Sequence, residues 1–300
     1  MACSVHVRSS QNHMATTFHF CIACDYSYAH RASRVLDEAL AWVGELEHQL
    51  SEYLTTSPIY KLNQSEAFCP VAMSTDAIEL FELAHTARVQ SNGLFDISAK
   101  TPASAAFPRI SWDRHNGSAW KTHAAVHIGF GAIGKGYALD RVRLLLEQNG
   151  FRDYQLSAGG SSWIFSGFAG PGHPWTWGWS WSSDEDGNPL GTCFQNKQGD
   201  PIALGISGTH EKGNHLIHPL LCENEKVLSA SGQLKSALVA SPSAALSDAF
   251  STALFVSQGD HLNKYGAAAI IDSENIPHWN FKFQSTWGQP SVQSENASRI

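Results

Sequence analysis

A glycine-rich segment, IGFGAIGKGYALD at residues 128–140, is the most informative feature of this sequence. An apolar run at residues 124–128 leads into it and predicts a strand. Apolar residues with roughly helical spacing follow it. A strand, a tight turn and a helix N-terminus together present backbone N–H groups and the positive end of a helix dipole to a bound phosphate. The segment therefore predicts a phosphate-binding turn in the middle of the chain.

Two other interpretations of this segment stay open. Gly129, Gly131 and Gly134 satisfy the spacing G-x-G-x-x-G of a dinucleotide-binding Rossmann unit. That unit needs an acid about 20 residues on, at the end of the next strand, to hold the ribose. The next expected strand, 154–158, leads into Gly159 and Gly160, and its nearest acid precedes it. The Rossmann interpretation is therefore disfavoured, and the other alternative is a glycine-rich turn that binds nothing.

Composition and charge narrow the class of protein. Hydrophobic residues make up 43% of the 300 residues and charged residues 16%, which is typical of a compact globular protein with one large domain or two intimate ones. The net charge of −7 argues against a nucleic-acid partner. No apolar run approaches the ~20 residues of a membrane span. The N-terminal segment lacks the apolar region of a secretory signal, so we expect a cytoplasmic protein.

Hydrophobic periodicity predicts an α+β protein. Helical spacing covers about 28–53, 74–90, the segment after the glycine turn, and 243–256. Strands are expected at 14–23, 154–158, near 201–206, 214–218 and 234–240, and residues 98–123 are expected to be irregular. We expect one domain over residues 1–285. Residues 286–300 are polar and are expected to form a disordered tail.

Four tryptophans alternate along one expected strand. Strict alternation places Trp175, Trp177, Trp179 and Trp181 on the same face. That face predicts a core or inter-sheet contact rather than an exposed stacking platform. Cys21 and Cys24 form a lone C-x-x-C with no second pair, and zinc needs four ligands, so two buried thiols are the favoured interpretation.

The last expected helix carries a second polar feature. Asp248 and Thr252 are four residues apart, so they share one face of a helix that is otherwise mostly apolar. A carboxylate and a hydroxyl that point the same way can hold a hard cation such as Mg²⁺ beside a phosphate. A hydrogen-bonded buried aspartate explains the pair equally well.

Seven fragments of the chain, in the same order, resemble motifs of one family. They are MATTF at 14–18, ELE with LSEY and LN within 45–63, NGLFD at 92–96, FGAIGKGYALD at 130–140, SAGG at 157–160, SG at 207–208 with HLIHP at 215–219, and AALSDAFSTALF at 244–255. On these fragments the chain resembles the ApbE family, the FAD:protein FMN transferases. The resemblance spans nearly the whole sequence.

The resemblance implies an ApbE-like fold, related to the T-fold, in which mixed sheets pack against helices. It implies Mg²⁺-dependent transfer of FMN from FAD to a Thr or Ser hydroxyl of an acceptor protein, with release of AMP. Asp248, Thr252 and the backbone carbonyl of Ala132 fall on metal-ligand positions. His215 falls on the position of a base for the acceptor hydroxyl. Positions that contact FAD fall on Met14, Tyr53, Asp96 and Lys135.

The chain also departs from the family pattern. Gly129 replaces the acid that opens the glycine-rich motif, Ser161 replaces an Asp after the glycine pair, and His218 replaces the Asp that precedes the proline. Residues 99–108 stand where the family has a segment that helps to seat adenine. These departures leave two alternatives to transfer. One is a module that binds FAD or another adenine nucleotide without transferring it, and the other is a scaffold that keeps only the fold.

Overall fold

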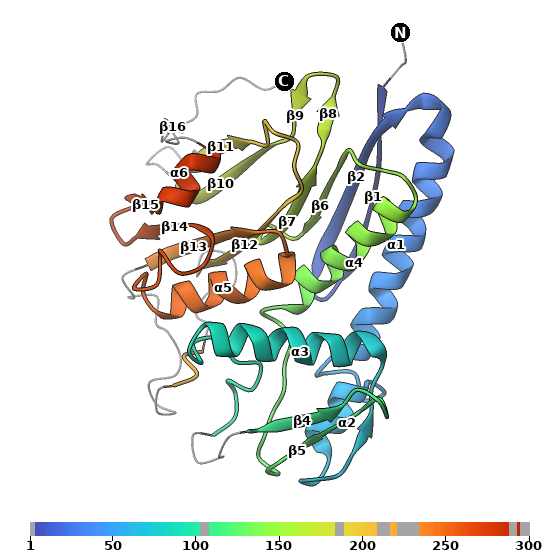
Figure 1. Cartoon of the computed structure of the whole chain (residues 1–300), viewed down its shortest axis with the longest axis vertical. Helices are drawn as coiled ribbons and strands as arrows, with labels where there is room; N and C mark the ends of the chain where they lie inside the picture. The colour runs from blue at the N-terminus through green and yellow to red at the C-terminus, as the bar shows by residue number, and fades with distance from the viewer. Residues whose placement is uncertain are drawn as a thin grey trace.

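An eight-stranded sheet forms the centre of the molecule in the computed structural model, which describes residues 4–102, 108–183, 189–208, 217–220, 234–287 and 293–294 (Figure 1). Every pairing along it is antiparallel. A Rossmann unit needs parallel strands, so that interpretation is wrong for this sheet. The strands follow the order β1 (Ser4–His13), β2 (Thr16–Asp25), β6 (Tyr154–Ala158), β7 (Ser162–Ser166), β12 (Ile202–Gly208), β13 (Leu234–Ser241), β14 (Ala267–Asp272) and β15 (Pro277–Trp279).

Three helices cover one face of this sheet: α1 (Ala29–Leu50), α4 (Gly134–Gln148) and α5 (Ala244–Val256) (Figure 1). The strand β2 shows why both faces are buried. Its residues Phe18, Phe20 and Ile22 join the core under the helices, whereas Cys21 and Ala23 join a second core on the opposite face. Alternate residues of a strand point to opposite faces, so an uninterrupted apolar run fits a strand that is covered on both sides.

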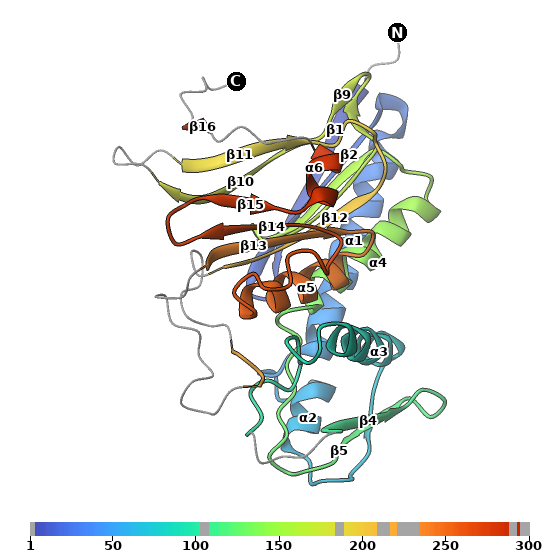
Figure 2. The same ribbon diagram turned by 60° about the vertical axis from the view of Figure 1, so that its left-hand side comes forward.

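A smaller sheet covers the opposite face. It consists of β10 (Thr176–Ser183), β11 (Pro189–Gln195) and β16 (Gln293–Ser294), and α6 (Phe281–Trp287) packs beside it (Figure 2). The side chains of Trp175, Trp177 and Trp179 are buried in the core between the two sheets. The core interpretation of the alternating tryptophans is confirmed for these three.

A third group of elements lies below α5 in Figure 1. The helices are α2 (Pro58–Gln64) and α3 (Thr75–Gln90), and the small sheet contains β3 (Val71–Ala72), β4 (Ile110–Asp113) and β5 (Ser118–Lys121). The short elements η1 (Tyr26–Tyr28), β8 (Phe168–Gly170) and β9 (His173–Pro174) complete the fold. The mixture of antiparallel sheets and helices confirms the α+β class.

Several elements differ from the expectation. The first expected strand is the second arm of a hairpin that turns at Met14 and Ala15. The region 98–123 contains β4 and β5. Ordered structure continues beyond residue 285, since α6 reaches Trp287, whose ring packs against Phe283, and β16 pairs with β11. The expected strand at 214–218 falls mostly on residues outside those described.

The remaining expectations concern the membrane and the thiols. Within the described ranges, no helix is both long and apolar enough to cross a bilayer. Cys21 is buried and Cys24 is partly exposed, and neither is disulfide-bonded. Burial raises the pKa of both thiols, which favours their protonated form.

Candidate active site

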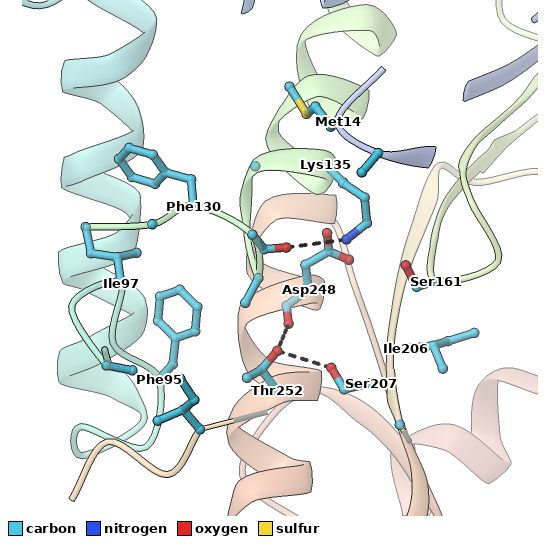
Figure 3. Close-up of a pocket in the computed structure, with 18 of the residues that line it drawn as sticks. Met14, Phe95, Ile97, Phe130, Lys135, Ser161, Ile206, Ser207, Asp248 and Thr252 are labelled. Atoms are coloured by element: carbon cyan, nitrogen blue, oxygen red, sulfur yellow. Dashed lines mark hydrogen bonds between the residues drawn. The ribbon is translucent and has the colours of Figure 1, made fainter. Parts of the chain in front are cut away.

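A cavity of about 760 Å³ lies between the glycine-rich turn at the start of α4 and the middle of α5 (Figure 3). Its centre is polar and contains Asp248, Thr252 and Lys135. One flank is apolar and is formed by Leu94, Phe95, Ile97 and Phe130. The other flank contains Trp163, Trp179 and Ile206. This volume lies in the range of small-molecule and cofactor sites.

Asp248 provides a buried carboxylate at the centre of the cavity. Its side chain is 5% exposed. The hydroxyl of Ser162 donates to both carboxylate oxygens, at 2.8 and 2.9 Å, and the backbone N–H of Gly136 donates to Oδ2 at 2.9 Å. Burial raises the pKa of Asp248 to about 7, although the charge of Lys135 and these hydrogen bonds oppose the shift. A buried carboxylate held by neutral donors is a suitable ligand for a cation.

Thr252 lies one helical turn beyond Asp248 and carries the second oxygen. Its hydroxyl donates to the backbone carbonyl of Asp248 at 3.1 Å and lies 3.1 Å from the hydroxyl of Ser207. Ser207, at the end of β12, also lies 2.9 Å from the hydroxyl of Ser251. The sequence pair Asp248 and Thr252 therefore faces the cavity from α5, as the spacing predicts, and Ser207 on β12 adds a second hydroxyl.

The glycine-rich turn lies across from α5. Gly131, Ala132, Gly134 and Lys135 all line the cavity. The ammonium group of Lys135 donates to the carbonyl of Gly131 at 3.5 Å and adds a positive charge beside Asp248 (Figure 3). Helix α4 begins at Gly134 without a side-chain cap. The N–H groups of Gly134 and Gly136 are bonded to the carbonyl of Phe130 and to Asp248, so the first turn offers the cavity mainly the positive end of the helix dipole.

Helices α4 and α5 cross at Gly136. A Cβ atom at this position would lie 2.2 Å from the carbonyl oxygen of Ala244, so only glycine permits the contact. Asp140 on α4 accepts hydrogen bonds from the backbone N–H groups of Ala244 and Ala245, at 2.8 and 3.0 Å, where α5 begins. The close crossing brings the glycine turn and Asp248 to the same point.

The segment that leads into the turn is not a strand, contrary to the sequence prediction. Asn63 takes the place of a neighbouring strand, because its side-chain oxygen accepts from the N–H of Ile128 at 2.8 Å and its amide donates to the carbonyl of Ile128 at 2.8 Å. The buried ammonium group of Lys121 in turn donates to the carbonyls of Asn63 and Ala124, both at 2.8 Å. These two side chains fix the entry to the glycine turn.

Met14, an expected FAD-contact residue, lines the cavity together with Ala15. Both residues have positive φ angles, +50° and +57°, in the two-residue turn between β1 and β2. Such turns favour Asn-Gly, since a side chain at positive φ is strained. Glu47 on α1 holds this turn, accepting from the N–H of Met14 at 2.7 Å and from the ring of His13 at 3.2 Å.

Tyr53 lies at the mouth of the cavity and is 77% exposed. The ammonium group of Lys100 lies 5.9 Å from the centre of its ring and donates to Glu52 at 2.6 Å. His127 bonds the same oxygen of Glu52 at 2.7 Å. A Cβ atom at Gly129 would lie 3.1 Å from Oε1 of Glu52. The Glu52 carboxylate therefore fills the space that a side chain at position 129 would enter.

Two further residues were expected in the site, Asp96 as an FAD contact and His215 as a base. Asp96 lines the cavity, but its carboxylate accepts from Arg88 at 3.0 Å and from the N–H and hydroxyl of Ser98, each at 2.7 Å. These bonds shape the loop that carries Phe95. His215 lies outside the described residues. Among the described side chains, no three His, Cys, Asp or Glu cluster as a metal site, so the metal assignment depends on a mixed set of oxygens.

Sequence reasoning missed several residues of the site. Ser162, which binds both oxygens of Asp248, follows the glycine pair and had no distinguishing pattern. Asn63 was noted only as part of a motif, and its bonds to the glycine turn were not foreseen. Trp163 and Trp179 on the second flank come from strands that no local pattern links to the turn.

The sequence model of the ApbE family matches residues 14–271. The chain belongs to the ApbE family. This match covers the turn at Met14, the glycine-rich turn and α5. No curated protein matches the sequence.

Solved structures of ApbE proteins share the fold. The flavin transferase ApbE from Vibrio cholerae is 17% identical with a TM-score of 0.78, over 95% of this chain and 100% of that chain. The apo form of the Pseudomonas stutzeri flavinyl transferase ApbE is 20% identical with a TM-score of 0.79, over 95% of this chain and 97% of that chain. An ApbE protein from Thermotoga maritima is 17% identical with a TM-score of 0.76, over 94% of this chain and 99% of that chain. The ApbE-like architecture is thereby confirmed.

Proposed function

We propose that this ApbE protein is an FAD:protein FMN transferase. In this reaction a hydroxyl oxygen of a Thr or Ser in an acceptor protein attacks the phosphorus of the FMN half of FAD. The bond from that phosphorus to the bridging oxygen breaks, AMP leaves, and the hydroxyl proton passes to a base. Membership of the ApbE family and the fold shared with two flavin transferases support the proposal.

One observation carries the proposal: aromatic side chains lie on both sides of the polar centre of the cavity. FAD has the same order of parts, since its diphosphate lies between adenine and isoalloxazine. The helix N-terminus at Gly134 and the ammonium group of Lys135 offer positive potential to the diphosphate. Phe95 and Phe130 on one flank and Trp163 on the other offer apolar surface to the rings.

The donor atoms at the centre fit Mg²⁺. This ion prefers oxygen ligands and is commonly held by one or two carboxylates plus phosphate oxygens. Asp248 would supply the carboxylate, Thr252 the hydroxyl and Ala132 a backbone carbonyl, and a set with one carboxylate leaves coordination positions for phosphate oxygens. A bound Mg²⁺ would offset the negative charge that develops on the phosphate oxygens during transfer.

The chain's own residues position the reacting groups. Ser162 and Gly136 hold the carboxylate of Asp248, and Asn63 holds the glycine turn opposite it. The ammonium group of Lys135, which lies beside Asp248 and the glycine turn, can neutralise negative charge on the leaving phosphate. Met14, Tyr53 and the loop of Asp96 border the cavity, where contact with FAD is expected.

We assign the base for the acceptor hydroxyl to His215, because neutral imidazole suits proton removal near neutral pH. Burial lowers the pKa of His218, two residues further on, and its Nδ1 accepts from the N–H of Leu220 at 3.3 Å. A second imidazole stabilises a protonated His215 less than an aspartate would. Transfer is therefore expected to be slow, and His218→Asp is expected to accelerate it.

The decisive experiment incubates the protein with FAD, Mg²⁺ and a flavin-acceptor domain. The expected result is acceptor protein that carries covalent flavin after denaturation, together with one AMP per flavin. EDTA should abolish both products, and His215→Ala should lose transfer while keeping FAD binding. A protein that binds FAD yet releases no AMP, even as the His218→Asp variant, would instead be the nucleotide-binding module.

A further inference from the structure

The flank of the cavity between the two sheets has a structure that catalysis at Asp248 does not explain. The lining passes from Ser161, at the β6–β7 turn, to Trp163 and Ile206 on the face of the large sheet that is turned away from the helices. Trp179 on β10 faces them from the smaller sheet. This part of the cavity is therefore a pocket between two β-layers, next to the polar centre.

Trp163 is held rigidly in this pocket. Its ring stacks on Phe165 with centroids 5.7 Å apart and planes 6° apart. Its indole N–H donates to the carbonyl of Gly160 at 3.1 Å. It lies on β7, which is paired on both sides with β6 and β12. The orientation of the indole is thus fixed before any ligand arrives.

Trp163 is also the accessible end of a row of stacked rings. Phe165 stacks on Trp177 at 6.4 Å, and Trp177 stacks on Phe194 at 4.9 Å. Those three rings are buried between the sheets, whereas Trp163 is partly exposed and lines the cavity. Because its N–H is already bonded to Gly160, the indole offers the cavity mainly an aromatic surface.

We propose that Trp163 is the platform on which a fused heteroaromatic ring of the bound nucleotide stacks, which makes it a further ligand-binding residue of the site. The proposal rests on the proposed function, because it places one end of FAD there. Stacking of a base on an aromatic side chain tolerates any ring with a π face. The two rings of FAD share this chemistry, and binding experiments with half-molecules distinguish them.

The test compares the parent with Trp163→Leu and Trp163→Phe. Equilibrium binding of FAD, FMN and AMP is measured by calorimetry, and thermal unfolding verifies that each variant is folded. Trp42→Phe, altered on α1 where Trp42 packs against the other core, is the matched control. Trp163→Leu should weaken FAD binding by about tenfold, as expected for the loss of one stacked ring, and Trp163→Phe should weaken it less.

The half-molecules identify the ring. A loss confined to FAD and FMN supports stacking and places isoalloxazine on Trp163, whereas a loss confined to FAD and AMP supports stacking and places adenine there. Unchanged FAD binding in Trp163→Leu, or an equal loss for FMN and AMP, overturns the proposal while leaving FMN transfer intact.

A parent that does not bind FAD overturns the proposed function itself. If Trp163→Leu fails to fold, Trp163→Met replaces it: parent-like affinity for FAD, FMN and AMP in that variant overturns the proposal, and a loss confined to FAD and one half-molecule supports it.

Discussion

Asp140 and Asp248 each accept hydrogen bonds from the start of the other's helix. Asp140 on α4 binds the N–H groups of Ala244 and Ala245 at the start of α5, and Asp248 on α5 binds the N–H of Gly136 at the start of α4. Neither helix can shift along the other without losing one of these caps. The exchange therefore fixes the carboxylate of Asp248 relative to the glycine turn.

Asp248→Asn should abolish Mg²⁺ binding while the protein stays folded. Asparagine keeps an acceptor for Gly136 but has no charge, and it removes the cost of burying a carboxylate whose pKa is raised to about 7 by burial. Binding is measured with Mn²⁺ as a paramagnetic substitute. Asp140→Asn is the matched control and should lose about 1 kcal/mol of stability as a weakened helix cap, yet keep metal binding. Parent-like Mn²⁺ binding in Asp248→Asn would refute the metal assignment.

Ala15→Gly should stabilise the protein by about 1 kcal/mol, because glycine adopts positive φ without the steric cost that alanine bears. Ala15 has a φ angle of +57°. The free energy of unfolding is measured by urea titration. The exposed Ala41, within α1, provides the contrast, since Ala41→Gly should cost about 1 kcal/mol there. A loss of stability in Ala15→Gly would show that the turn is not strained.

Glu52→Gln should lower stability at neutral pH by about 1 kcal/mol. Burial alone would raise the pKa of Glu52, but hydrogen bonds and charges from Lys100 and His127 outweigh it and hold the pKa below its usual value. The unfolded chain then binds more protons than the folded one over the interval between the two pKa values, so this stabilisation is lost as pH falls through the folded pKa. Urea titrations of parent and variant should therefore converge in acid. A constant difference between them at every pH would contradict this account.

Asn63→Ala should destabilise the protein by about 2 kcal/mol, since it leaves the N–H and the carbonyl of Ile128 without their partner. Asn63→Asp keeps the acceptor for the N–H but places a carboxylate oxygen against the carbonyl of Ile128, so it should lose at least as much. FAD affinity should fall in both variants, because Ile128 leads directly into the glycine turn. Calorimetry and chemical denaturation check both effects. If Asn63→Ala is destabilised but binds FAD as well as the parent, the hydrogen bonds of Asn63 stabilise this segment without positioning the FAD site.

Hydrophobic periodicity correctly predicted those helices and strands that a short stretch of sequence is enough to specify. The expected helices at 28–53 and 74–90 appear as Ala29–Leu50 and Thr75–Gln90, and the expected strand 154–158 appears unchanged. The i, i+4 pair of Asp248 and Thr252 also faces the cavity together, because helical spacing alone decides that.

Long-range partners explain what the sequence did not reveal. The apolar run at 124–128 has the composition of a strand, yet the amide of Asn63, 65 residues away in sequence from Ile128, takes its hydrogen bonds. Ser162 donates a hydrogen bond to Asp248, which lies 86 residues further along the sequence. The hairpin turn at Met14 and Ala15 lacks the Asn-Gly that marks such turns, so the first strand was not recognised.

The walls of the cavity come from stretches far apart in the chain, from Met14 at one end to Thr252 at the other, and they belong to both cores. A nucleotide bound there would touch helices, both sheets and the intervening loops at once. Mass action then raises the stability of all of them by the same increment, about 2.7 kcal/mol when free ligand exceeds its dissociation constant a hundredfold. Heating with FAD should therefore delay loss of the helices and of the inter-sheet tryptophan core together, in one cooperative transition.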